Sequence, residues 1–205
     1  MNQFPKAANG LKLMFYGEIL AIIGIFLTLI LIGPVISLVG SIMVLVGLYQ
    51  AREDDEGYGT AFMLSIIGII LDIIGMFFSG GVMASLLSII STIISLAIVY
   101  FVCTTTSNLL HCVGAVETEQ RGRTVWNIYL ICNIISVVLT LLLFIPLLNV
   151  LAVVGMLMAA IAQLVGYIMY LQFLNSSYKL LCGSGISSEP NEGPRHPRRG
   201  PPFQA

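Results

Sequence analysis

Six long apolar segments dominate this chain of 205 residues, and they decide what it can fold into. A helix needs roughly 20 mostly apolar residues to cross the hydrocarbon core of a bilayer. Only 9% of the residues are charged, so the chain lacks the charge to cover a soluble surface, where about 25% is usual. We therefore predict an all-α integral membrane protein with six transmembrane helices, at about residues 11–32, 34–50, 60–78, 83–103, 125–145 and 147–170.

The positions of the cations predict how these helices are oriented. Three of the five connections carry no charge: Gly33-Pro34, Ser79-Gly80-Gly81 and Ile145-Pro146. Cationic loops stay in the cytoplasm, so both termini are expected there, in the plasma membrane if the source is prokaryotic. All nine cations lie in the other connections, near them or in the tails: Lys6, Lys12, Arg52, Arg121, Arg123, Lys179, Arg195, Arg198 and Arg199.

Short and long connections alternate, which predicts three consecutive antiparallel hairpins at about 11–50, 60–112 and 124–181. The first helices of hairpins one and two share local sequence, since Ile22–Ile25 matches Ile66–Ile69. Hairpins two and three end alike, at Thr104–Leu110 and Asn175–Leu181. A degenerate threefold repeat explains these matches, and chance similarity among helices rich in Ile, Leu and Gly explains them equally well.

The two ends of the chain differ from its middle. Residues 1–10 are expected to form a cytoplasmic N-terminal segment, and residues 11–181 the six-helix transmembrane domain. The fourth and sixth helices are expected to continue past the bilayer, to about Cys112 and Leu181. Residues 182–205 are rich in Pro, Gly and Arg and cannot bury a core, so they predict a disordered cytoplasmic tail.

Two carboxylates lie inside apolar segments: Glu18 in the first and Asp72 in the third. An acidic group there is costly and marks a candidate functional site with a polar neighbour. Glu18 can also reach the inner interface or bond to a Tyr or Asn there. Asp72 shares a helix face with Ser65 and Ser79, so a structural hydrogen bond to a neighbouring Ser explains it about as well as an ion site does.

Small and polar residues recur on one face of most segments, which allows helices to pack closely or to line a hydrated cavity. Packing is the interpretation that we weight more heavily. If a cavity exists, Glu18, Asn133 and Gln163 are expected in its inner half, and Asp72 and Thr140 in its outer half. The residues expected to mediate helix packing are Gly40, Gly68, Gly75, Ser88, Gly155 and Gly166.

The sequence lacks the motifs of the common enzyme and metal sites. His111 and His196 are far apart, and the four cysteines show no Cys-x-x-Cys spacing. We therefore expect no catalytic residues, no metal and no cofactor, and the net charge of −1 argues against a nucleic-acid partner. The acidic run Glu53–Glu56 is either a solvated turn, the more common case, or a binding site for a cation or basic partner.

Two functions remain. The favoured hypothesis is a small non-enzymatic membrane protein that acts by helix–helix association, as a structural or accessory subunit of a membrane assembly. Its partners would be the lipid bilayer and a second copy or another membrane protein. The alternative is a transporter or substrate-binding component for a small solute or ion, which uses Asp72 or Glu18. The sequence does not identify that ligand.

Overall fold

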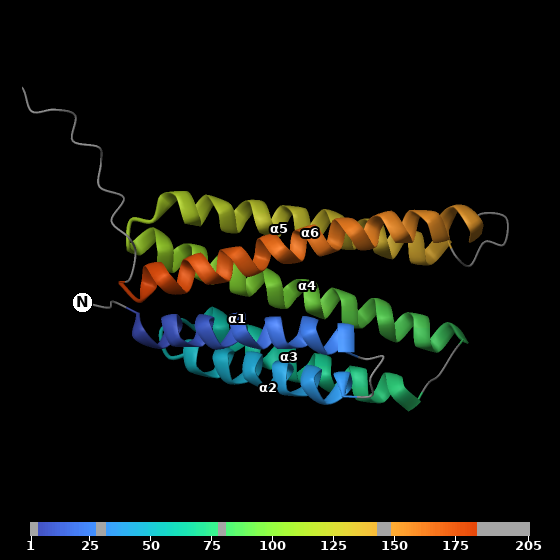
Figure 1. The fold of residues 1–205 in the computed structure, drawn as a ribbon, viewed down its shortest axis with the longest axis horizontal. Coiled ribbons are helices and arrows are strands. Elements are labelled where there is room, and N and C mark those ends of the chain that lie inside the picture. Colours follow the sequence, from blue (N-terminus) through green and yellow to red (C-terminus); the bar gives the residue numbers. More distant parts are fainter. Residues whose placement is uncertain (1–3, 28–31, 78–80, 143–148, 184–205) are drawn as a thin grey trace, which may run out of the picture.

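The computed structural model describes residues 4–27, 32–77, 81–142 and 149–183, and this part of the chain is all-helical. Its helices run back and forth beside one another (Figure 1). They are α1 (Pro5–Phe26), α2 (Gly33–Ala51), α3 (Glu56–Phe77), α4 (Gly81–Cys112), α5 (Val116–Leu142) and α6 (Asn149–Leu181). The predicted all-α class and the six helices are confirmed.

Five of these helices, α1, α3, α4, α5 and α6, are long and apolar enough to cross a membrane, so the chain is a polytopic membrane protein. The exception is α2, whose apolar stretch Val35–Ala51 falls short of that length. It is also the segment that was shortest in the sequence-based prediction. Two of the predicted short connections, at Ser79-Gly80 and Ile145-Pro146, and the predicted tail from residue 184 lie outside the described residues.

Two helices begin earlier than their hydropathy predicted. α1 starts at Pro5, within the segment expected to precede the first helix, and α5 starts at Val116. The start expected for the fifth helix, at about residue 125, is therefore wrong. The chain turns at Gly114, which has a φ of 77° and donates its N–H to His111, while the N–H of Ala115 bonds to Leu110. This Schellman motif completes the turn within a few residues. The polar residues that follow it can therefore belong to α5.

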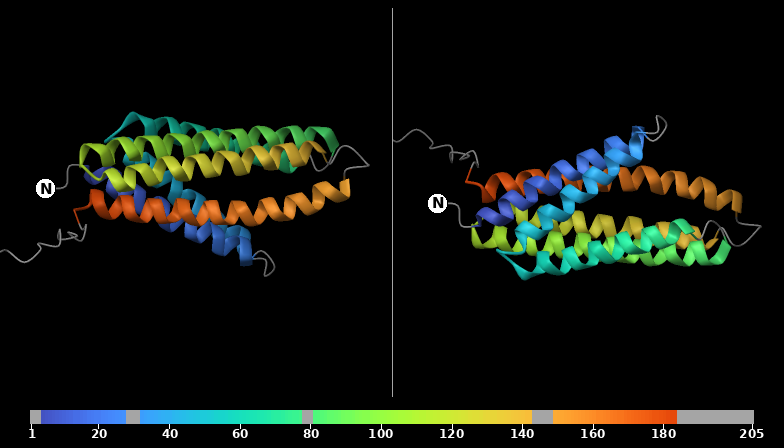
Figure 2. Two further views of the ribbon diagram at one scale, coloured as in Figure 1. Left: turned by 90° about the horizontal axis from the view of Figure 1, so that it is seen from above. Right: turned by 90° about the horizontal axis from the view of Figure 1, so that it is seen from below.

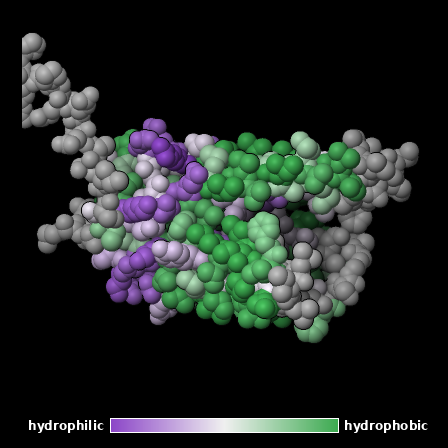
Figure 3. Space-filling view, in the orientation of Figure 1, coloured by the Kyte–Doolittle hydropathy of each residue, from purple (hydrophilic) through white to green (hydrophobic). Residues whose placement is uncertain are grey.

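The predicted extensions of α4 to Cys112 and of α6 to Leu181 are confirmed. Charged residues and the ends of these extensions gather at one end of the molecule, which we call the charged end (Figure 3). The buried core also lies near this end. Its largest fully buried side chains include Leu11, Met14, Leu48, Tyr58, Val102, Leu110 and Leu174.

The far end of the bundle is packed less tightly. Large apolar side chains are exposed there, including Phe26 at 72% and Phe77 at 82% of their accessible surface. Figure 2 shows that the α1–α2 hairpin is inclined to the other helices and diverges from α6 toward this end. The α1–α2 hairpin therefore separates from α6 away from the charged end, while α1 and α2 stay in contact as far as Gly24.

The backbones of α1 and α2 lie in close contact, because glycines face one another along this hairpin. A Cβ built on Gly17 would lie 2.7 Å from the carbonyl oxygen of Gly40, and one built on Gly40 would lie 2.6 Å from that of Gly17. Only glycine permits backbones to approach this closely. The glycines recur every seven residues, at Gly10, Gly17 and Gly24 in α1 and at Gly33, Gly40 and Gly47 in α2.

The acidic run between α2 and α3 caps two helices. Asp55 accepts the N–H of Gly57 at 2.8 Å and so caps α3. Asp54 accepts the N–H of Ala7 at 2.6 Å, in the first turn of α1, and Glu53 pairs with Lys6 at 2.9 Å. The run is thus more than a solvated turn, because it ties the second connection to the start of the first helix.

Candidate functional site

A central cavity of about 290 Å³ lies between the helices, and residues of all six helices line it. Apolar side chains such as Met14, Leu48 and Val99 bound part of it. One ionisable carboxylate, Glu18, faces this space from α1. The other polar side chains that line it are hydroxyls: Ser41, Ser65, Ser91, Ser95, Tyr129, Tyr167 and Tyr170.

Tyr167 of α6 donates a hydrogen bond from its hydroxyl to the carboxylate of Glu18. Their helices are first and last in the chain, so this bond closes the bundle across the cavity. The rings of Tyr167 and Tyr170 lie with centroids 6.3 Å apart at an interplanar angle of 51°. From α5, Tyr129 adds a third ring, and its hydroxyl interacts with Ser95. The cavity that holds the carboxylate is therefore lined by hydroxyl groups and aromatic rings.

No Lys, Arg or His occurs among the described residues that line this cavity. A carboxylate in a low-dielectric site gains far more from a neighbouring cation than it would in water. Its present partner, a Tyr hydroxyl, supplies a hydrogen bond but no charge. The site can therefore accept a positively charged group that the chain itself does not provide there.

A second cavity, which we call the lateral cavity, has a volume of about 540 Å³ and lies between α1, α5 and α6. Its walls are mainly apolar, from Ile22, Phe26, Ala160 and Leu164. Asn133 and Gln163 also contribute to it. The lateral cavity shares two residues with the central one, Tyr129 and Tyr167.

The polar residues that the sequence predicted for one cavity do not all line the same cavity in the structure. Glu18 lines the central cavity, while Asn133 and Gln163 line the lateral one. Asn133 donates to the carbonyl of Tyr129 at 2.8 Å, and Gln163 donates to the hydroxyl of Ser136 at 2.9 Å. Thr140 bonds to the carbonyl of Ser136 at 2.8 Å within α5 and is not among the residues that line either cavity.

Asp72 stays a candidate on sequence grounds. Its backbone belongs to α3, between Gly68 and Gly75, and its side chain lies outside the described part of the structure. The structure therefore does not place Asp72 at either cavity.

The residues expected to mediate packing differ in how closely they are packed. Gly40 is in tight contact with the backbone of α1. A Cβ on Gly155 would lie 2.8 Å from a Leu139 methyl group, and one on Gly166 would lie 3.5 Å from Ile128, so both face α5.

The two α3 glycines and Ser88 have more space. A Cβ on Gly68 would make an ordinary contact of 3.6 Å with Ile94, and one on Gly75 would meet nothing within 4 Å. Ser88 is exposed on α4, where its carbonyl accepts the hydroxyl of Thr92. These three positions therefore contribute little to packing within the described chain.

Sequence reasoning missed the part that tyrosines play in the central cavity. Tyr129, Tyr167 and Tyr170 lie in the inner halves of predicted helices, a position that also suits an anchor at the membrane interface. Tyr167 and Tyr170 are three residues apart, so they share a helix face, and that spacing was the available signal.

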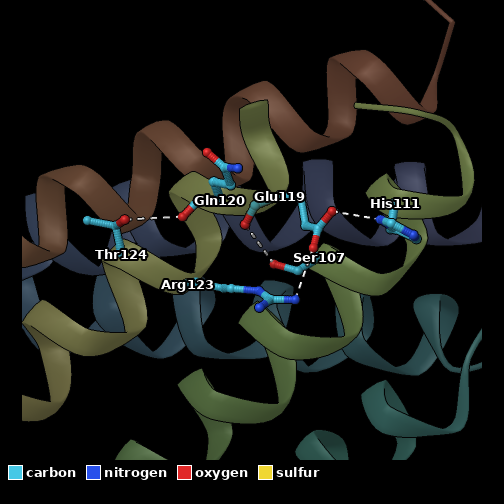
Figure 4. A network of polar contacts seen from close by, with 6 residues as sticks. All are labelled: Ser107, His111, Glu119, Gln120, Arg123 and Thr124. Atoms are coloured by element: carbon cyan, nitrogen blue, oxygen red, sulfur yellow. Dashed lines mark hydrogen bonds and ion pairs between the residues drawn. The ribbon is translucent and has the colours of Figure 1, made fainter. Parts of the chain in front are cut away.

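A separate polar cluster lies at the charged end, where α4 turns into α5 (Figure 4). The carboxylate of Glu119 bridges His111 at 2.9 Å and Arg123 at 3.1 Å. Ser107 donates its hydroxyl to the carbonyl of Glu119 at 3.3 Å. Because Glu119 is buried while His111 and Arg123 are exposed, this cluster fastens the turn to the bundle and leaves the His111 and Arg123 side chains at the surface.

Comparison with known proteins yields no relative for this chain. No family model matches it, and no curated protein and no solved structure is significantly similar to it. The function must therefore be argued from the chain's own geometry.

Proposed function

We propose that this chain is a non-enzymatic polytopic membrane protein that binds a small organic ammonium ion in its central cavity, with Glu18 as the counter-ion. The observation that carries the proposal is a carboxylate in a cavity that all six helices line and whose described walls hold no cation. Ionisable residues within membrane segments are uncommon and mark ligand or ion pathways.

The surroundings of Glu18 favour an ammonium ion over a metal. A calcium ion takes six to eight oxygen ligands, generally with several carboxylates. No group of three or more His, Cys, Asp or Glu occurs in the described residues in a metal-binding arrangement, and Glu18 is the single acid of this lining. An ammonium group has N–H donors for a carboxylate and for Ser hydroxyls, and aromatic faces attract it through their quadrupoles.

The proposal includes an orientation. With the charged end in the cytoplasm, both termini lie inside and the turns at the far end lie outside, as the distribution of Lys and Arg favours. The α2 helix is then a short helix that the glycine contacts hold against α1. The threefold hairpin repeat and the disordered tail remain part of this proposal on sequence grounds.

The test is a thermal-unfolding measurement on the purified full chain in detergent. Methylammonium chloride should raise the Tm relative to sodium chloride at the same ionic strength, because a ligand that binds only the folded state stabilises it by RT ln(1 + [L]/Kd). The Glu18→Gln variant keeps an acceptor for Tyr167 but loses the charge, so its Tm should respond equally to both salts.

A matched control is Glu56→Gln, since Glu56 is an exposed acid at the start of α3. This variant should respond to methylammonium as the wild type does. An equal response of wild type and Glu18→Gln would show that Glu18 is not the counter-ion, and the proposal would fail.

A second function, association with a partner helix, rests on α3. Ile70, Ile73 and Ile74 lie on one face of this helix at helical spacing, and all three are exposed. This face is thus free to contact a second copy or another membrane protein. Crosslinking of an Ile70→Cys variant in membranes, with a cysteine-free background, would test it: absence of any crosslinked species would argue against this face.

A further inference from the structure

We infer that the ammonium ligand is amphiphilic, with its charged group at Glu18 and its apolar body in the lateral cavity, which it enters from the bilayer. This inference rests on the proposed function, because it assumes that Glu18 binds a cation. It adds the chemical class of the remainder of the ligand and the route by which the ligand arrives.

The two cavities adjoin at Tyr129 and Tyr167, beside Glu18. Tyr129 and Tyr167 line both of them, and Tyr167 donates its hydroxyl to Glu18. On α1, Ile22 lies one helical turn beyond Glu18 and belongs to the lateral cavity. On α6, Leu164 lies three residues before Tyr167, on the same face. A ligand bound at Glu18 therefore has the lateral cavity directly beside it.

The walls of the lateral cavity suit an apolar body. Ile22, Phe26, Ala160 and Leu164 are apolar, and the cavity carries no charged residue among its described lining. The side-chain amides of Asn133 and Gln163 already donate hydrogen bonds within the protein, to the carbonyl of Tyr129 and to Ser136.

The dimensions also fit. The lateral cavity, at about 540 Å³, is larger than the central one at about 290 Å³, and small-molecule sites commonly span roughly 300–1,000 Å³. From Glu18 to Phe26, eight residues along α1, the distance is about 12 Å at 1.5 Å per residue. The charged group thus fits the smaller space, which holds the carboxylate and the hydroxyls, and the apolar body fits the larger one.

The lateral cavity is open to the surface that faces lipid, since two residues of its lining are exposed: Phe26 at 72% and Leu164 at 49%. The α1–α2 hairpin also diverges from α6 toward the far end of the bundle (Figure 2). A molecule with an apolar body concentrates in the bilayer and reaches this opening from there. A neutral chain would also fit the apolar walls but would leave Glu18 without a cation, so charge complementarity selects the amphiphilic ammonium.

The experiment measures displacement of radiolabelled methylammonium from the purified full chain in nanodiscs. Phenethylammonium, which adds an apolar body, should displace the label at a concentration at least tenfold lower than unlabelled methylammonium does. Neutral 2-phenylethanol, which enters the bilayer but carries no charge, should not displace it. Two variants locate the effect: Ala160→Phe fills the lateral cavity, and Ala162→Phe adds the same ring at an exposed α6 position outside it.

Ala160→Phe should keep methylammonium binding and abolish the tenfold advantage, whereas Ala162→Phe should keep both. If phenethylammonium shows no advantage, if Ala160→Phe leaves it intact, or if 2-phenylethanol displaces the label equally well, the inference is wrong while the proposed function stands. If neither amine binds in a manner that depends on Glu18, the proposed function fails, and the inference fails with it.

Discussion

The close contact between α1 and α2 can be tested by adding one methyl group at Gly40. In Gly40→Ala, the added carbon would lie 2.6 Å from the carbonyl oxygen of Gly17 and 2.8 Å from the backbone nitrogen of Ala21. Both are backbone atoms, so no side-chain rotation relieves the overlap. Ordinary contact begins at 3.4 Å. The helices must therefore separate by roughly 0.8 Å, and a gap of about 0.5–1 Å forfeits a quarter to a half of each contact's attraction.

The expected cost follows from this separation. Overpacking of a well-packed interface costs about 1–3 kcal/mol, and alanine regains up to about 1 kcal/mol in helix propensity over glycine. We expect a net loss of about 1–2 kcal/mol, which corresponds to a fall in Tm of roughly 2–8 °C for a chain of this size. The assay is thermal unfolding of the purified protein in detergent, followed by tryptophan fluorescence.

The control is Gly75→Ala, whose added carbon meets nothing within 4 Å. Its Tm should be unchanged or slightly higher, because alanine favours the helix and nothing has to move. If Gly40→Ala is as stable as Gly75→Ala, the backbones of α1 and α2 are not in the contact described here, and the reasoning from the period-seven glycines fails.

Three further predictions follow from the orientation, the tail and Asp72. In intact cells, on a cysteine-free background, a membrane-impermeant thiol reagent should label a cysteine at Gly80 but not one at Asp55; labelling of Asp55 alone would reverse the orientation. Truncation before Ser184 should leave the Tm in detergent nearly unchanged, because a chain of that composition buries no core, and a large drop would show that it packs on the bundle. Asp72→Asn should keep both stability and methylammonium binding, while Asp72→Leu should lower stability modestly, by about 0.6–1.7 kcal/mol; a stable Asn variant that no longer binds would assign the counter-ion role to Asp72.

Hydropathy and turn chemistry predicted the helices well, because both act locally. Uninterrupted apolar runs predict the membrane-spanning helices. The sequence that follows the fourth and sixth runs predicted the helical extensions to Cys112 and Leu181. The start of α5 was not predicted, because Glu117 and Arg121 suggested a charged connection between two helices. In the structure they pair at 2.6 Å across one helical turn, which stabilises the helix that they begin.

The candidate site could be predicted only in part. Glu18 stands out because a carboxylate is rare in an apolar helix. Its partner Tyr167 lies 149 residues away, and no local pattern specifies which helices of a bundle meet. The small residues gave an ambiguous signal for the same reason: Gly40 and Gly75 look alike in sequence, yet one faces α1 and the other faces open space.

The most direct test of the account is equilibrium dialysis of radiolabelled methylammonium against the full chain in nanodiscs. Glu18 is the single acid of the described cavity lining, so the account predicts saturable binding of one ion per chain, which Glu18→Gln abolishes and Glu56→Gln leaves unchanged. Binding that persists in Glu18→Gln, or the absence of saturable binding to the wild type, would contradict it.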